Sequence, residues 1–213
     1  MMDARLSPIV THSLVPVVVI DDADSALGLA EALVAGGLPV AEVTFRTAAA
    51  AEAIARMATN PDILVGAGTV RTAEQVDQAV DAGAKYIVSA GLSAAVVRRA
   101  QDRGVPVLPG TVTATEILAA TELGLDTVKF FPAETSGGVA AIKALAAPFP
   151  DITFVPTGGV GPKNLADYLA VPAIAACGGS WMCPRDAVKA GDFATIERLT
   201  REAVELVRST KEA

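Results

Sequence analysis

The stretch TATEILAATELGLDTVKFF, residues 113–131, predicts a helix followed by a buried strand. Thr113 is a favourable N-cap residue, and Gly124 marks the end of the helix because glycine readily takes the left-handed conformation found there. The run Thr127–Phe131 then combines β-branched and aromatic residues, which favour a strand. This helix–strand pattern is the unit from which the rest of the chain is built.

The same alternation recurs from residue 15 to residue 176, with a period of about 20–25 residues, the length of one strand, one helix and their loops. The predicted strands are Val15–Ile20, Val40–Phe45, Ile63–Val65, Tyr86–Val88, Val105–Leu108, Thr127–Phe131, Ile152–Val155 and Ala173–Ala176. Predicted helices that start at Asp, Ser or Thr and end at glycine are Asp24–Gly36, Thr72–Ala82, Ser93–Arg103 and Thr113–Leu123.

Strict alternation of strands and helices predicts a parallel sheet, either closed into a barrel or open and doubly wound. We expect an α/β protein with a (β/α)₈ TIM barrel, near the small end of the size range of such barrels, because eight units share 213 residues. The whole chain, residues 1–213, is predicted to form one domain. Met2–Ser13 should form an extra N-terminal helix, and Asp192–Lys211 a helix on the outside.

The charge distribution argues against several classes of partner. The net charge is −7 and no Lys/Arg stripe is present, so nucleic acid and anionic membranes are poor partners. No apolar run reaches the roughly 18 residues of a membrane span, and no secretory signal is evident, so a cytoplasmic location is expected. Cys177 and Cys183 match no metal or redox spacing and are predicted to be buried free thiols.

His12 is the only histidine, which disfavours Ser-His-Asp or Cys-His catalysis and metal sites built on imidazoles. We therefore expect no metal site; no cofactor is predicted either. His12 itself precedes the first strand, where a surface or packing role is the simpler interpretation.

Charged residues inside the predicted strands are the main candidates for chemistry. In a barrel, the C-terminal ends of the strands carry the site. Glu42, Thr44 and Arg46 share one face of the second strand, and Lys129 lies in the sixth. Burial disfavours the ammonium form of a lysine, which leaves an amine able to attack a carbonyl. The structural alternatives are an ion pair at the barrel mouth involving Glu42 and Arg46, or a lysine that merely neutralises Glu42.

Glycine-rich strand ends complete the pattern. Gly66-Ala67-Gly68-Thr69 offers small residues beside which a ligand could approach the backbone, although glycine near a strand end is a weak signal. Thr157-Gly158-Gly159 and Gly178-Gly179-Ser180 follow the last two strands, where barrels commonly bind phosphate through backbone amides. Each turn alone could be ordinary turn chemistry, but the two together favour phosphate.

Five motifs, in order along the chain, resemble those of the 2-keto-3-deoxy-6-phosphogluconate (KDPG) and 4-hydroxy-2-oxoglutarate aldolases. They are Glu42-Val43-Thr44-Phe45-Arg46, Val65-Gly66-Ala67-Gly68-Thr69-Val70, Lys129-Phe130-Phe131-Pro132-Ala133-Glu134, Pro156-Thr157-Gly158-Gly159 and Gly178-Gly179-Ser180-Trp181. The resemblance implies a class I aldolase that cleaves KDPG to pyruvate and D-glyceraldehyde 3-phosphate, usually as a homotrimer.

The resemblance also implies roles for individual residues. Lys129 would form the imine, with Glu42 as general acid/base and Phe131 beside the imine. Arg46 and Thr69 would hold the pyruvate carboxylate. The distal hydroxyls and phosphate would be bound by Thr157, Gly158, Gly159, Gly179 and Ser180. The small-molecule partner implied is a phosphorylated ketoacid.

Ala90 is a departure, because the family's loop after the fourth strand usually reads Ser-Pro-Gly and here reads Ser89-Ala90-Gly91. Alanine restores an N–H and frees a backbone angle at a position expected to line the substrate. The sequence leaves open whether KDPG, 4-hydroxy-2-oxoglutarate or the galactonate epimer is preferred, although Arg46 favours the gluconate series. A phosphosugar isomerase or epimerase, and a non-catalytic binding barrel, remain the rival interpretations.

Overall fold

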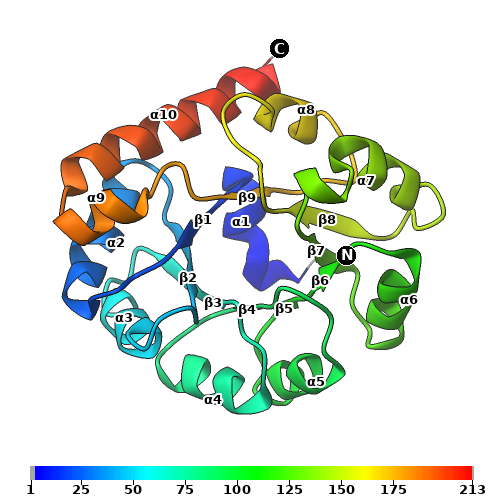
Figure 1. The fold of residues 1–213 in the computed structure, drawn as a ribbon, viewed down its shortest axis with the longest axis horizontal. Coiled ribbons are helices and arrows are strands. Elements are labelled where there is room, and N and C mark those ends of the chain that lie inside the picture. Colours follow the sequence, from blue (N-terminus) through cyan, green and yellow to red (C-terminus); the bar gives the residue numbers. More distant parts are fainter. Residues whose placement is uncertain (1–2, 213) are drawn as a thin grey trace.

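In the computed structural model, which describes residues 3–212, helices surround a curled and entirely parallel arrangement of strands (Figure 1). The strands are β1 Leu14–Val18, β2 Val40–Thr44, β3 Leu64–Gly68, β4 Ile87–Val88, β5 Val107–Leu108, β6 Gly110–Thr111, β7 Thr127–Phe130, β8 Thr153–Pro156 and β9 Cys177–Gly179. The predicted α/β class with a parallel sheet is confirmed.

Two sheets account for these strands. One has the order β5-β4-β3-β2-β1-β9 and the other the order β6-β7-β8. Only Pro109 separates β5 from β6, and it interrupts the ladder because proline has no N–H to donate. On the other side, isolated parallel bridges join Phe154 to Ile174 and Thr157 to Gly178, so β8 also lies beside the segment that leads into β9.

The predicted strand Ala173–Ala176 was wrong, because the strand is Cys177–Gly179. Its position follows from pairing with β1, in which Leu14 lies opposite Cys177. Glycine has a low preference for strands, so local propensity favoured the apolar residues before it. The remaining strand predictions are confirmed to within a few residues, except that the run Val105–Leu108 is shorter in the structure and continues as β6 after Pro109.

The helices begin and end at signals that are visible in the sequence. Those on the outside of the strands are α2 Ala26–Ala35, α3 Ala50–Met57, α4 Ala73–Asp81, α5 Ala94–Asp102, α6 Ala114–Glu122, α7 Gly138–Ala146, α8 Leu165–Leu169, α9 Arg185–Ala190 and α10 Phe193–Glu212. The side chains of Thr72, Ser93 and Thr113 cap α4, α5 and α6 as predicted. Asp24 is not a cap: Asp22 caps the short 3-10 helix Ala23–Ser25 that precedes α2.

The N-terminal helix lies at the centre of the ring in Figure 1. The 3-10 helix Ala4–Leu6 leads into α1, Ser7–His12, which confirms the predicted extra helix; Met2 lies outside the described residues. Leu6 and Ile9 join a buried cluster with side chains of five strands, among them Val15 and Val40 at the beginnings of β1 and β2. The helix therefore seals the interior at the N-terminal ends of the strands.

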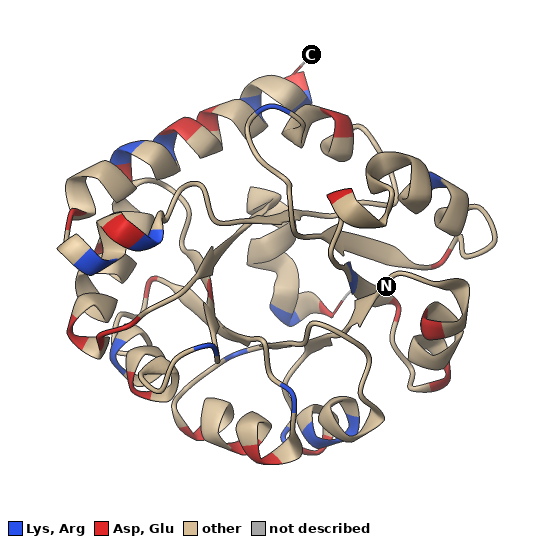
Figure 2. Cartoon of the chain, in the orientation of Figure 1, with Lys and Arg blue, Asp and Glu red and all other residues tan. Residues whose placement is uncertain are grey.

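A second and larger cluster lies between the strands and the outer helices. Alternate strand residues belong to it, such as Val18, Val43 and Val128, and their neighbours point to the interior. Lys, Arg, Asp and Glu lie mostly on the outer helices (Figure 2). None of the helices in residues 3–212 is long and apolar enough to span a membrane.

Candidate active site

Lys129 of β7 and Glu42 of β2 form an ion pair in the interior. Lys129 Nζ lies 3.1 Å from Glu42 Oε1, and the residues are only 5% and 3% exposed. Removing two charges from water costs free energy that their attraction only partly repays, so such a pair is weak evidence for stability. Its position at the C-terminal half of the strands is where barrel enzymes place their reactive groups.

Tyr86 and two glycines define the space around Glu42. The Tyr86 hydroxyl donates to the carbonyl of Ala41 at 2.8 Å. Burial, and then the charge of Glu42, raise the pKa of Tyr86 well above its ordinary value, so the hydroxyl stays protonated. A Cβ at Gly66 would lie 2.2 Å from Tyr86 Cζ, and one at Gly68 would lie 2.2 Å from Glu42 Oε1. The expectation that these glycines leave room for a ligand was wrong, because protein side chains fill that room.

Arg46 and Thr69 meet at the ends of β2 and β3. The Arg46 Nε–H donates to Thr69 Oγ1 at 3.4 Å, and Arg46 is exposed. Thr69 has a φ of 58°, a left-handed conformation that is uncommon for a β-branched residue and that marks the sharp end of the strand. The hydroxyl of Thr44, which was predicted to share a strand face with Glu42 and Arg46, donates to the carbonyl of Val18 at 2.9 Å and so links β2 to β1.

A cavity of about 440 Å³ opens at this end of the strands. It is lined by Val17, Val19, Arg46, Phe131, Thr157, Gly158, Gly159, Val160, Gly178, Gly179, Ser180, Cys183, Pro184 and Arg185. The centroid of the Phe131 ring lies 5.3 Å from Lys129 Nζ, so the ion pair lies next to the cavity lining. Seven of the eleven predicted site residues therefore surround one space. Those outside its lining are Thr69, Ala90 and the ion pair itself, Lys129 and Glu42.

The Gly158–Gly159 turn is held by its carbonyl groups. The Glu134 N–H donates to the Gly158 carbonyl at 3.0 Å, and Asn164 Nδ2 donates to the Gly159 carbonyl at 3.1 Å. No residue between 3 and 212 accepts a hydrogen bond from the N–H of either glycine. Two backbone donors are thus left available to an anion.

Glu134 and Asn164 were not predicted as functional, although Glu134 belongs to one of the quoted motifs. The Glu134 carboxylate accepts a hydrogen bond from the Tyr168 hydroxyl. Burial and this hydrogen bond raise the pKa of Tyr168. A Cβ at Gly159 would lie 2.5 Å from Glu134 Cγ, so the turn and this carboxylate are fitted to each other. The sequence motif marks Glu134, but nothing local marks its contact with α8.

Cys183 is one of the residues that line the cavity, whereas Cys177 and His12 are not. Cys177 and Cys183 are free and buried as predicted, and burial raises the pKa of each thiol to about 12. His12 ends α1, directly before β1, and therefore lies at the opposite end of the strands. Across residues 3–212, no group of three or more His, Cys, Asp and Glu side chains is arranged to hold a metal ion.

Comparison with known proteins identifies the family. The family model described as KDPG and KHG aldolase matches residues 7–199. The chain belongs to this aldolase family. It is accordingly a carbon–carbon lyase, as the five motifs predicted.

Relatives of this aldolase cover most of its length. A 2-dehydro-3-deoxy-phosphogluconate aldolase of Treponema pallidum is 48% identical over 195 residues, 91% of this chain and 93% of that protein. The KHG/KDPG aldolase of Escherichia coli is 44% identical over 200 residues, 93% of this chain and 94% of that protein.

Solved structures agree with the family assignment. The KDPG aldolase of Zymomonas mobilis with 3-phosphoglycerate has a TM-score of 0.88 at 44% identity, covering 95% of this chain and 96% of that one. The KDPG aldolase of Legionella pneumophila, with pyruvate captured as a covalent carbinolamine, has a TM-score of 0.90 at 37% identity, covering 95% and 99%.

Proposed function

We propose that this aldolase cleaves KDPG to pyruvate and D-glyceraldehyde 3-phosphate through an imine on Lys129. The observation that carries the proposal is the buried amine of Lys129, 3.1 Å from a carboxylate and beside a cavity lined by arginine and glycine turns. Imine-forming cleavage of a phosphorylated ketoacid requires an amine nucleophile, a general acid/base and groups that bind the substrate's anionic ends.

The carboxylate of the substrate would be held by Arg46, with Thr69 supplying a hydroxyl, because a guanidinium binds carboxylates through charge-assisted hydrogen bonds. Arg46 lines the cavity and is already hydrogen-bonded to Thr69. The phosphate would be bound by the N–H groups of Gly158 and Gly159, together with Gly179 and Ser180 of the neighbouring turn. Thr157 and Phe131 would contact the carbon chain between these two anchors.

The cycle begins when Lys129 passes a proton to Glu42, 3.1 Å away, and the resulting amine attacks the C2 carbonyl. Loss of water, with Glu42 moving the protons, gives a protonated imine that acts as an electron sink. Glu42 then removes the proton of the C4 hydroxyl, directly or through a water molecule, and the C3–C4 bond breaks to release the aldehyde. Protonation of the enamine at C3 and hydrolysis of the imine return pyruvate and the free lysine.

The relatives support this chemistry. The Legionella pneumophila aldolase was captured with pyruvate as a covalent carbinolamine, the adduct that precedes an imine. The Zymomonas mobilis aldolase was solved with 3-phosphoglycerate, a small phosphorylated carboxylate. In this chain an amine and a carboxylate lie next to a cavity lined by arginine and glycine turns.

4-Hydroxy-2-oxoglutarate, cleaved to pyruvate and glyoxylate, is a second substrate that we propose. A solved structure described as a 4-hydroxy-2-oxoglutarate and 2-dehydro-3-deoxyphosphogluconate aldolase is 38% identical to this chain. The ketoacid end that Lys129, Glu42 and Arg46 would recognise is common to the two. The galactonate epimer is the alternative substrate; a KDPGal structure is 30% identical, and Arg46 is the feature of this chain that favours the gluconate series.

We further infer that the strands close into one eight-stranded (β/α)₈ barrel, and that residues 1–213 form a single domain. Three features support closure: β9 pairs with β1, isolated bridges link β8 to the segment around β9, and only Pro109 divides β5 from β6. Counting β5 and β6 as one interrupted strand gives eight.

A homotrimer is the assembly that we propose, on the basis of the family resemblance. A chain in a designed protein cage, made by fusing symmetric oligomeric domains, is 30% identical to this one. Light scattering coupled to size-exclusion chromatography should give three times the 21.6 kDa mass of the chain at micromolar concentration. A mass equal to that of one chain would refute the trimer.

Reductive trapping tests the proposed function. Incubation with pyruvate and sodium borohydride should add one reduced pyruvate to the protein, and peptide mapping should place it on Lys129. KDPG should then be cleaved to pyruvate in a coupled assay. Folded protein that yields no adduct would remove the imine mechanism and favour the phosphosugar isomerase instead.

A further inference from the structure

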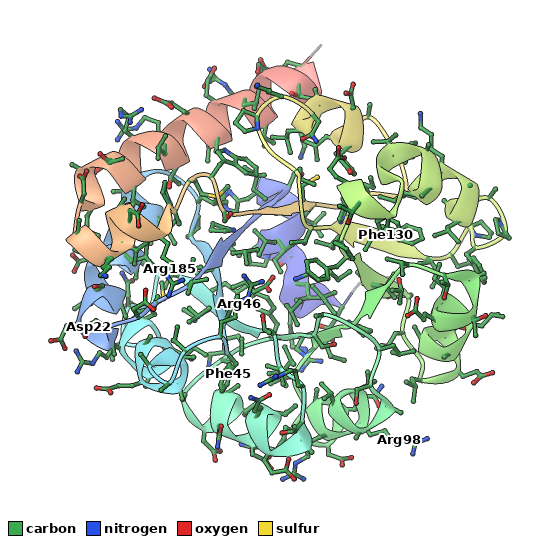
Figure 3. The ribbon with its side chains drawn as sticks, viewed as in Figure 1. Asp22, Phe45, Arg46, Arg98, Phe130 and Arg185 are labelled. Atoms are coloured by element: carbon green, nitrogen blue, oxygen red, sulfur yellow. The ribbon has the colours of Figure 1, made fainter. Side chains whose placement is uncertain are left out.

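Arg185 is a second cation on the rim of the cavity. It is the first residue of α9 and follows Pro184, a few residues after the Gly179–Ser180 turn. Among the described residues that line the cavity, Arg46 and Arg185 carry charge, and no acidic side chain lines it. Figure 3 shows Arg46 within the ring and Arg185 on the inner side of α9, whereas Arg98 lies at the outer edge.

Asp21, three residues after β1, fixes the orientation of the Arg185 side chain. Arg185 Nε donates to Asp21 Oδ2 at 2.8 Å, and Nη2 donates to Oδ1 at 2.6 Å. This two-point contact orients the planar guanidinium. Within the described part of the chain, Nη1 takes part in no hydrogen bond. The Arg185 side chain is 61% exposed, and Arg185 is one of the residues that line the cavity.

The two arginines come from different strand ends, because Arg46 follows β2 and Arg185 follows β9. Arg46 donates to Thr69, and these two residues follow β2 and β3, the strand of Glu42 and its neighbour. The ketoacid end of the substrate is proposed to bind there. Arg185 is close in sequence to the Gly179–Ser180 turn, where the phosphate is proposed to bind. The glycine turns offer neutral N–H donors, whereas a guanidinium adds a charge-assisted hydrogen bond to a phosphate oxygen.

We propose that Arg185 binds the distal phosphate and selects phosphorylated ketoacids over unphosphorylated ones, an inference that rests on the proposed function. An exposed Arg–Asp pair contributes little to stability, so a purely structural role predicts little effect from its removal. Asp21 neutralises much of the positive charge of Arg185. The gain in phosphate affinity therefore comes mainly from the guanidinium N–H donors, which Asp21 already holds in position. The expected effect is therefore about tenfold, near the lower end for a charged hydrogen bond.

The test compares two substrates across matched variants. For Arg185→Gln, kcat/KM for KDPG should fall about tenfold through KM, while kcat/KM for 4-hydroxy-2-oxoglutarate falls twofold or less. Inorganic phosphate, used as a competitive inhibitor of KDPG cleavage, should bind correspondingly more weakly. Arg98→Gln, a change of the same kind on the exposed face of α5, should alter neither substrate.

An equal fall for both substrates, or no fall for KDPG, would overturn the proposal. Equal falls would mean that Arg185 supports the fold of this region, and an unchanged KDPG value would mean that the glycine turns suffice. Pyruvate trapping and KDPG cleavage by the wild-type protein show whether the proposed function itself holds. If the wild-type protein traps pyruvate and cleaves KDPG, an unaffected Arg185→Gln variant disproves only the role of Arg185.

Discussion

Replacing Lys129 with methionine is expected to abolish KDPG cleavage, with kcat reduced by at least about 10⁴-fold, the scale seen when a covalent nucleophile is removed. Methionine keeps most of the volume of lysine but cannot form an imine. Pyruvate and borohydride should add no mass to the variant. Lys143→Met, an exposed position on α7, serves as the control and should trap and cleave normally.

The same substitution should also lower stability. Glu42 would be left buried without the cation that lies 3.1 Å away, and removing one partner of a buried ion pair costs about 3–5 kcal/mol. The double variant Lys129→Met/Glu42→Gln removes both charges and should recover part of that loss in urea unfolding. Loss of activity in a double variant that has regained stability would then reflect chemistry alone. Near-normal turnover by Lys129→Met would disprove the imine scheme.

Replacing Glu42 with glutamine is expected to lower kcat by about two to four orders of magnitude, the usual contribution of a general acid/base. Glutamine has nearly the same shape, so the tight fit against Gly68 is kept. Lys129 remains, and therefore borohydride should still trap pyruvate, though more slowly. Slow turnover with retained trapping separates proton transfer from nucleophilic attack.

Glu52→Gln is the matched control, because Glu52 is on the outward side of α3 and pairs with Arg56 on the surface. It should leave kcat unchanged. If Glu42→Gln kept more than about a third of the wild-type kcat, Glu42 would be a structural counter-ion of Lys129, and another group or a water molecule would have to move the protons.

Much of the fold could be predicted because its signals are local. Thr72, Ser93 and Thr113 cap helices through bonds to residues three positions away, and these patterns are visible in the sequence alone. Lys129 and Glu42 were noticeable because charges are rare within apolar strands. Their contact joins residues 87 apart in the chain, and the barrel prediction was needed to bring them together.

What could not be predicted depends on contacts between distant residues. Gly66 and Gly68 look like a ligand-binding strand end, but only the structure shows Tyr86 and Glu42 filling the space beside them. The position of β9 is set by its register with β1 rather than by its own residues. Arg185 carries no local signal, since its partner Asp21 lies 164 positions earlier in the sequence.

Leu6 and Ile9 pack at the N-terminal ends of the strands, and the cavity beside Lys129 opens at the opposite ends. The ketoacid fragment is proposed to stay attached to Lys129, deeper than the aldehyde fragment, which leaves from the rim. Release must then be ordered: the aldehyde departs first and pyruvate last. In the reverse reaction the same geometry makes pyruvate the first reactant to bind, because an aldehyde that entered first would occupy the cavity beside the amine.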